Sequence, residues 1–180
     1  MSESIGVIIL AAGTGSRFRR IAGPDKDKLL ADCTGRDGAL RSVIEQVLVN
    51  LPASLEKRVL VTSKDRPQAI RMAQAYGCDV VELDSPGLGD SIAAGVQACP
   101  GLDGWLMVLG DMPFILPSSI EQVVAAIRTD GISVPVLAGE YGHPVGFGRE
   151  FGPKLMALTG DRGPRHCLPG RSKCRWMTLA

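Results

Sequence analysis

Apolar runs alternate with helical patterns along most of this sequence. The apolar runs are mostly continuous, which is typical of strands buried on both faces of a parallel sheet. They predict strands at residues 5–11, 58–63, 79–83, 105–109, 132–137 and 143–147, separated by helices at 39–50, 67–76, 90–98 and 117–128. This alternation indicates βαβ units. The pattern therefore predicts a Rossmann-like three-layer α/β/α sandwich with a mostly parallel sheet.

Composition and charge narrow the class of protein. A chain of 180 residues is expected to build one core, so we treat 1–180 as a single domain. The net charge of +1 provides no global field for a nucleic acid or an anionic membrane, and we expect neither as a partner. Five separated cysteines without a CxxC pair disfavour a disulfide framework or a zinc site. The N-terminal apolar run is too short to span a bilayer and has no basic lead-in, so we expect a cytoplasmic protein.

The first predicted strand ends in a glycine-containing loop, LAAGTGSRF. Ligands of open parallel sheets bind beyond the carboxyl ends of the strands, and Gly13 and Gly15 would let backbone N–H groups approach a phosphate there. The loop is not the dinucleotide fingerprint, because Phe18 stands where its third glycine is needed, and the sequence contains no Walker motif. A plain strand-to-helix turn is the alternative explanation.

Two cations near this loop favour phosphate binding. Arg17 follows Gly15 by two residues, and Lys28 opens the segment KLLAD. Arginine grips phosphate oxygens in a fork, whereas lysine acts as a point charge beside the phosphorus centre. Lys26 is a rival for the lysine role, but the apolar pair behind Lys28 favours Lys28. Taken singly, each cation could be a solvated surface charge.

Asp111 follows the apolar run WLMVLG and precedes Met-Pro, which puts a carboxylate at the carboxyl end of a strand. Mg²⁺ takes one or two carboxylates and completes its shell with water and phosphate oxygens, so Asp111 is the candidate metal ligand. An Asx turn or a cap of the next helix is the alternative.

Several longer segments follow one another in an order that resembles a known family. They are LAAGTGSRF with a later KLL, GLGDSIAAGV at 87–96, LGDMPFI at 109–115, GHPVGF at 142–147 and LTGDRGPR at 158–165. Together they resemble the MobA-like nucleotidyltransferases, most closely the molybdenum cofactor cytidylyltransferase branch. The resemblance implies the fold of nucleotide-diphospho-sugar transferases, with Mg²⁺ as cofactor.

The resemblance also implies roles for individual residues. Catalysis falls to Lys28, Arg17 and Asp111, with Asp111 holding the metal. Nucleotide contacts are expected from Leu10, Ala11, Ala12, Gly13, Gly15, Arg17, Lys28, Gly89, Asp90 and Ser91, although a glycine-rich helix start explains the last three equally well. His143 and Asp161 would contact the pterin or phosphate of the acceptor, while His143 could equally be a strand-end residue.

Two departures from the family pattern bear on these roles. RRIAGPDKD at 19–27 is longer and more charged than the usual link, so the family pattern by itself does not fix the position of Lys28. Relatives continue past TGDRG to a DIDTP-like sequence, whereas this sequence ends in SKCRWMTLA. A C-terminal acidic metal contact is therefore expected to be missing, replaced by Asp84 or Asp90, or lost together with activity.

The function that the resemblance implies is transfer of CMP from CTP to a molybdopterin-type acceptor, because GLGDSIAAGV resembles the cytidylyl branch. The alternative enzyme uses GTP or another nucleotide, or a sugar phosphate as acceptor. An alternative of another class is a non-catalytic nucleotide- or pterin-binding module, for instance a chaperone for a molybdenum hydroxylase.

Overall fold

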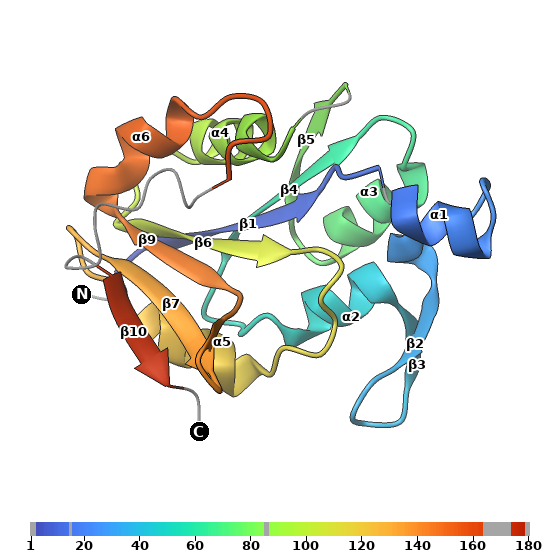
Figure 1. The fold of residues 1–180 in the computed structure, drawn as a ribbon, viewed down its shortest axis with the longest axis horizontal. Coiled ribbons are helices and arrows are strands. Elements are labelled where there is room, and N and C mark those ends of the chain that lie inside the picture. The colour runs from blue at the N-terminus through green and yellow to red at the C-terminus, as the bar shows by residue number, and fades with distance from the viewer. Residues whose placement is uncertain (1–2, 15, 85–86, 164–173, 179–180) are drawn as a thin grey trace.

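A central sheet enclosed by helices on both faces forms the protein in a computed structural model (Figure 1), which describes residues 3–14, 16–84, 87–163 and 174–178. The strand order is β10-β7-β9-β6-β1-β4-β5, and β8 pairs with β7. The strands of this sheet are β1 (Ile5–Ala11), β4 (Lys57–Ser63), β5 (Asp79–Leu83), β6 (Gly104–Leu109), β7 (Ile132–Leu137), β8 (Glu140–Tyr141), β9 (Val145–Gly148) and β10 (Cys174–Thr178).

Helices form the two outer layers. They are α1 (Ser16–Ala22), α2 (Val43–Asn50), α3 (Pro67–Ala75), α4 (Leu88–Ala98), α5 (Pro117–Ala125) and α6 (Gly152–Met156), with short 3-10 helices η1 (Lys28–Leu30) and η2 (Arg149–Phe151). Figure 1 shows α4 and α6 on one face of the sheet and α2 and α5 on the other. Most strand pairs are parallel, while β9 runs antiparallel to both β6 and β7. The predicted α/β/α sandwich is confirmed.

The core explains why the apolar runs are continuous. Side chains of a strand alternate between its two faces, so a strand covered on both faces must be apolar throughout. In β1, Val7 and Ile9 pack among residues of α2, α3 and α5, whereas Ile8 packs beside α4. All three are fully buried. Each such side chain stabilises the fold by roughly 1.5–3 kcal/mol.

The largest difference from the predicted elements lies at 39–50, where the helix begins only at Val43. Residues 40–42 instead form strand β3 (Leu40–Ser42), which pairs antiparallel with β2 (Asp32–Thr34). The turn between the strands contains Gly38 at a φ of 79°, a conformation that favours glycine. Ser42 then caps the helix by accepting the Glu45 N–H at 3.3 Å. The turn and the cap thus move the helix start.

Other elements were not predicted from the sequence. They are α1, α6, the 3-10 helices, β8, β10 and the β2–β3 hairpin, all of them short. The strand predicted at 143–147 begins at Val145, after a cis peptide bond between His143 and Pro144. No helix in the described part of the chain is long and apolar enough to cross a membrane.

The sheet brings together the glycine-containing loop after β1 and the loop after β6 that carries Asp111. Strands β1 and β6 are adjacent and parallel, with Leu10 opposite Leu109. The Gly110 N–H donates to the Leu10 carbonyl at 2.9 Å just beyond the strand ends. A Cβ at Gly110 would lie 3.1 Å from that oxygen, so glycine permits this close approach. The loop after β1 and Asp111 therefore share one edge of the sheet.

Candidate active site

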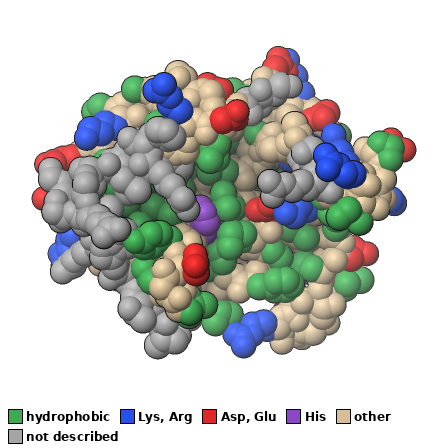
Figure 2. Space-filling model, viewed as in Figure 1, with side chains coloured by type: hydrophobic (Ala, Val, Ile, Leu, Met, Phe, Trp, Pro, Cys, Tyr) green, Lys and Arg blue, Asp and Glu red, His purple; other side chains and the backbone are tan. Residues whose placement is uncertain are grey.

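An open cleft of about 590 Å³ lies at this edge of the sheet. Six parts of the chain line it: residues 10–14 and Phe18 at and after the end of β1; Lys28 and Leu29; Arg66 after β4; Gly87, Leu88 and Ser91 around the start of α4; Leu109 and Asp111 at the end of β6; and Asp161 after α6. On the face drawn in Figure 2, basic and acidic side chains lie side by side near the middle, beside hydrophobic ones. The cleft thus combines apolar walls with a few charges, as small-ligand sites commonly do.

Lys28 and Asp111 meet in this cleft. The Lys28 Nζ donates to the Asp111 Oδ2 at 2.8 Å, and the two side chains are 43% and 41% exposed. Asp27 caps η1 by accepting the Leu29 N–H at 3.1 Å, and Leu29 is buried, so the backbone at Lys28 is fixed. An ion pair this exposed stabilises a fold by at most about 1 kcal/mol. Both charges are therefore available to a ligand at little cost to stability.

The other predicted cations are placed differently. Lys26 lines a separate hollow next to Pro67 and Arg71, away from Asp111. Among the two lysines weighed for the phosphate role, the structure thus brings Lys28 to the cleft. Gly15 lies outside the described residues, and so does the Arg17 side chain, although Arg17 belongs to α1.

A buried arginine that was not predicted from the sequence, Arg66, donates hydrogen bonds to the loop after β1. Arg66 is 5% exposed and donates from Nη1 to the Ala11 carbonyl and from Nη2 to the Gly13 carbonyl, each at 2.5 Å. Thr62 also donates to Ala11, at 3.1 Å. In the same segment as Arg66, the Ser63 hydroxyl lowers the pKa of Asp65 by donating to its carboxylate. A polar cluster, SKDR, directly after a buried strand was the signal for this residue.

The segment GLGDS is divided between two roles. Ser91 lines the cleft and donates to the Gly87 carbonyl at 3.2 Å. Gly89 is buried, and a Cβ there would lie 2.6 Å from the Arg162 carbonyl oxygen, so glycine is needed for packing. Asp90 accepts the N–H of Gly87 at 3.0 Å and that of Gly160 at 3.1 Å. Contrary to the expectation of a nucleotide contact, Asp90 ties the start of α4 to the 159–162 loop and does not line the cleft.

The remaining acidic and acceptor-side residues are only partly brought together. Asp161 lines the cleft, whereas His143 is half-buried and does not belong to the described lining. Asp84 pairs with Lys64 at 3.0 Å on the surface and faces other hollows. Within the described ranges there is no cluster of three His, Cys, Asp or Glu side chains that could hold a metal.

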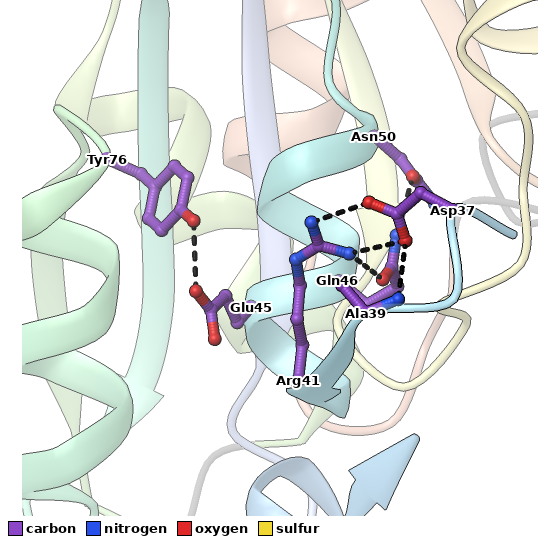
Figure 3. Close-up of polar contacts among 7 residues, drawn as sticks. All are labelled: Asp37, Ala39, Arg41, Glu45, Gln46, Asn50 and Tyr76. Carbon is purple, nitrogen blue, oxygen red and sulfur yellow. Dashed lines mark hydrogen bonds and ion pairs between the residues drawn. The ribbon is translucent and has the colours of Figure 1, made fainter. Parts of the chain in front are cut away.

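The Asp111 loop is supported by a chain of polar contacts (Figure 3). Asn50 donates to the Pro113 carbonyl at 2.8 Å, and its own side-chain oxygen accepts from Gln46 at 2.9 Å. Arg41 donates to Gln46 at 3.1 Å and grips Asp37 through both terminal nitrogens, at 3.0 and 2.7 Å. The hydrogen bonds from Arg41 to Asp37, with one from the Ala39 N–H, lower the pKa of Asp37 to about 2. The chain links the β2–β3 hairpin to the loop that follows Asp111.

The cleft offers one side chain suited to Mg²⁺, the carboxylate of Asp111. Asp111 offers a hard carboxylate oxygen at a half-exposed position in the same cleft as the glycine-containing loop, where water and ligand oxygens could complete an octahedral shell. Asp90 and Asp84, the substitutes considered for a second ligand, are engaged elsewhere. Asp111 would therefore hold the ion together with the nucleotide.

Asp90→Asn tests whether Asp90 holds the backbone or serves as a second metal ligand. We expect it to lower the free energy of unfolding by about 1–2 kcal/mol, or the Tm by roughly 2–8 °C, because an NH₂ group would replace one acceptor of two backbone N–H groups. The matched control, Asp84→Asn, breaks only an exposed ion pair and should change stability by less than about 0.5 kcal/mol. Thermal unfolding measures both. A larger Mg²⁺ requirement for activity in either variant would make that residue a metal ligand after all.

The sequence resembles known proteins over most of its length. Residues 7–174 match the MobA-like NTP transferase domain. Bifunctional protein GlmU from Prochlorococcus marinus (strain MIT 9313) is 30% identical over 167 residues, which are 91% of this chain and 35% of that protein. The chain spans about a third of the length of the curated relatives it matches.

Solved structures share the fold. The Rv0371c homologue from Mycobacterium sp. strain JC1 has a TM-score of 0.79 and 24% identity, covering 99% of this chain and 87% of its own. A nucleotidyl transferase from Methanothermobacter thermautotroptrophicus has a TM-score of 0.78 and 22% identity, with 99% and 88% covered. Rv0371C from Mycobacterium tuberculosis H37Rv in complex with manganese has a TM-score of 0.72 and 24% identity, with 99% and 89% covered. By its match over residues 7–174, this chain belongs to the family of the MobA-like NTP transferase domain.

Proposed function

We propose that this protein is a magnesium-dependent nucleotidyltransferase that transfers CMP from CTP to a molybdopterin-type acceptor and releases pyrophosphate. The observation that carries the proposal is the contact of Lys28 Nζ with Asp111 Oδ2 at 2.8 Å, in a cleft bordered by the glycine-containing loop. A cation, an anion and backbone donors around one cleft suit a metal-bound polyphosphate.

In the proposed reaction an oxygen of the acceptor phosphate attacks the α-phosphorus of the triphosphate in line. A new P–O bond forms, the bond to the bridging oxygen breaks, and pyrophosphate leaves with that electron pair. No covalent enzyme intermediate is needed, so the protein contributes orientation and charge stabilisation. Mg²⁺, when bound, neutralises phosphate charge and polarises the reacting phosphorus.

The chain's own residues have separate tasks in this scheme. Lys28 exchanges its ion pair with Asp111 for a contact with the phosphates and follows the charge that develops there. Asp111 holds the metal. Leu10 and Leu109 supply an apolar wall for the nucleotide, and Asp161, which lines the same cleft, is proposed as an acceptor contact on the resemblance. Arg17 is proposed as a second phosphate contact on the resemblance alone.

The choice of CTP and of the acceptor rests on the segment GLGDSIAAGV, whose Gly87 and Ser91 line the cleft. The decisive experiment mixes the purified chain with Mg²⁺, each of the four ribonucleoside triphosphates, and molybdopterin or a sugar phosphate. We expect CTP to raise the Tm most, since a ligand of the folded state stabilises it by mass action, and pyrophosphate to appear only with CTP and molybdopterin.

Each other outcome of this panel is informative. Pyrophosphate release with another nucleotide or with the sugar phosphate would keep the transferase and overturn its proposed substrates. Binding of CTP without release under all conditions would replace the enzyme by a non-catalytic binding module. If no triphosphate shifts the Tm, the assignment of the cleft to nucleotides is wrong.

A further inference from the structure

Arg66 makes an unusual set of contacts for a residue outside the predicted site. Its guanidinium is 5% exposed and spans two carbonyl groups of the loop after β1, those of Ala11 and Gly13. Its Nε lies 3.3 Å from the Oδ2 of Asp27, the residue that caps η1 immediately before Lys28. One buried cation therefore joins the glycine-containing loop to the segment that carries the phosphate-binding lysine.

The peptide geometry gives these contacts a consequence for ligand binding. In a planar trans peptide the carbonyl of one residue and the N–H of the next point in opposite directions. Arg66 and Thr62 hold the Ala11 carbonyl on the β4 side, so the Ala12 N–H points towards β6 and Asp111. The Gly13 carbonyl is also held by Arg66, so the Thr14 N–H points away from the guanidinium. Both carbonyls are thus fixed, with the N–H groups of the same two peptides turned away from Arg66.

We infer that Arg66 is a positioning residue of the nucleotide site, which aims the N–H groups of Ala12 and Thr14 at the phosphates through the carbonyls of Ala11 and Gly13. This inference rests on the proposed function, since it concerns the binding of a triphosphate. Only arginine carries a planar fork that reaches two carbonyls and a carboxylate at once. A lysine would keep the charge and lose the geometry.

The chain offers a matched control in Arg58. This half-buried arginine lies near the start of β4, whereas Arg66 follows the end of that strand, and it donates to the carbonyls of Leu55 at 2.7 Å, Pro52 at 3.1 Å and Tyr76 at 3.4 Å. Arg58→Lys thus removes the same kind of contact far from the cleft. Both lysine variants should lower the Tm.

The test compares Arg66→Lys with Arg58→Lys in two measurements. By calorimetry with magnesium and CTP, Arg66→Lys should raise the Kd about 10-fold, because the amide donors are no longer held in place, and Arg58→Lys should leave it within about 2-fold. By NMR relaxation of the ligand-free protein, the backbone N–H groups of Ala12 and Thr14 should become more mobile only in Arg66→Lys, because only there are the carbonyls of their peptides released. Equal behaviour of the two variants in both measurements would overturn the inference.

The two proposals fail in distinguishable ways. If the wild-type protein binds no triphosphate, the proposed function falls, while the mobility of the Ala12 and Thr14 N–H groups still decides whether Arg66 orders the loop. If Arg66→Lys does not fold, Asp27→Asn takes its place, because it removes the carboxylate charge beside the Arg66 Nε and keeps an oxygen for the Leu29 N–H. That variant should raise the Kd about 3-fold, and an unchanged Kd would contradict the link.

Discussion

Asp111→Asn is expected to lower the turnover number by about 100- to 1,000-fold while the fold stays intact. The substitution keeps the volume of the side chain and an oxygen that can still accept from Lys28 Nζ, and it removes the charge that attracts a divalent cation. Loss of electrostatic stabilisation from a single group typically costs this much in turnover. Pyrophosphate release under saturating Mg²⁺ and nucleotide gives the rate, and thermal unfolding gives the stability.

The affinity of the variant for the nucleotide without metal separates loss of the metal ligand from general damage to the site, because the two change it in opposite directions. Asp111 is an anion in a cleft assigned to a polyanion, so its neutralisation should strengthen binding of the nucleotide without metal by about 2- to 5-fold. The gain in affinity that Mg²⁺ gives the wild-type protein should disappear in the variant. Turnover within 3-fold of wild type, or an undiminished effect of Mg²⁺ on affinity, would remove Asp111 from the metal site.

The layers of the fold could be predicted from the sequence because burial on both faces leaves an unbroken apolar run. Three predicted strands, at 5–11, 79–83 and 132–137, have the observed bounds. The β2–β3 hairpin could not be predicted in this way, because its strands are three residues long and neither contains a buried residue. The antiparallel direction of β9 is also invisible in the sequence, since it depends on which neighbour the strand joins.

The candidate site could also be predicted only in part from the sequence. Lys28 and Asp111, which the structure brings together in one cleft, could be proposed from the sequence because each belongs to a recognisable pattern, at a strand end or next to an apolar pair. Arg66 was missed because its importance comes from two carbonyls more than 50 residues away in the sequence. Asp90 was assigned to the nucleotide because a sequence motif does not reveal that a carboxylate accepts from Gly160, 70 residues further on. Contacts of this range become visible only in the folded chain.

Lys28→Met is expected to reduce turnover by about 100-fold or more and to weaken nucleotide binding without metal, the opposite sign to Asp111→Asn. Methionine keeps most of the apolar stem and removes the point charge that approaches the phosphates. Because the ion pair with Asp111 is half-exposed, the free energy of unfolding should change by less than about 1 kcal/mol.

Lys26→Met is the matched control, since it removes a lysine two residues away that lines a different hollow. It should leave turnover and affinity within about 2-fold of wild type. If Lys26→Met and Lys28→Met reduced turnover equally, the effect would come from the net charge of the 19–28 segment and not from a contact with the phosphates. In the double variant of Lys28 and Asp111, the losses should combine less than multiplicatively, because both side chains act on the same polyphosphate and already touch one another at 2.8 Å.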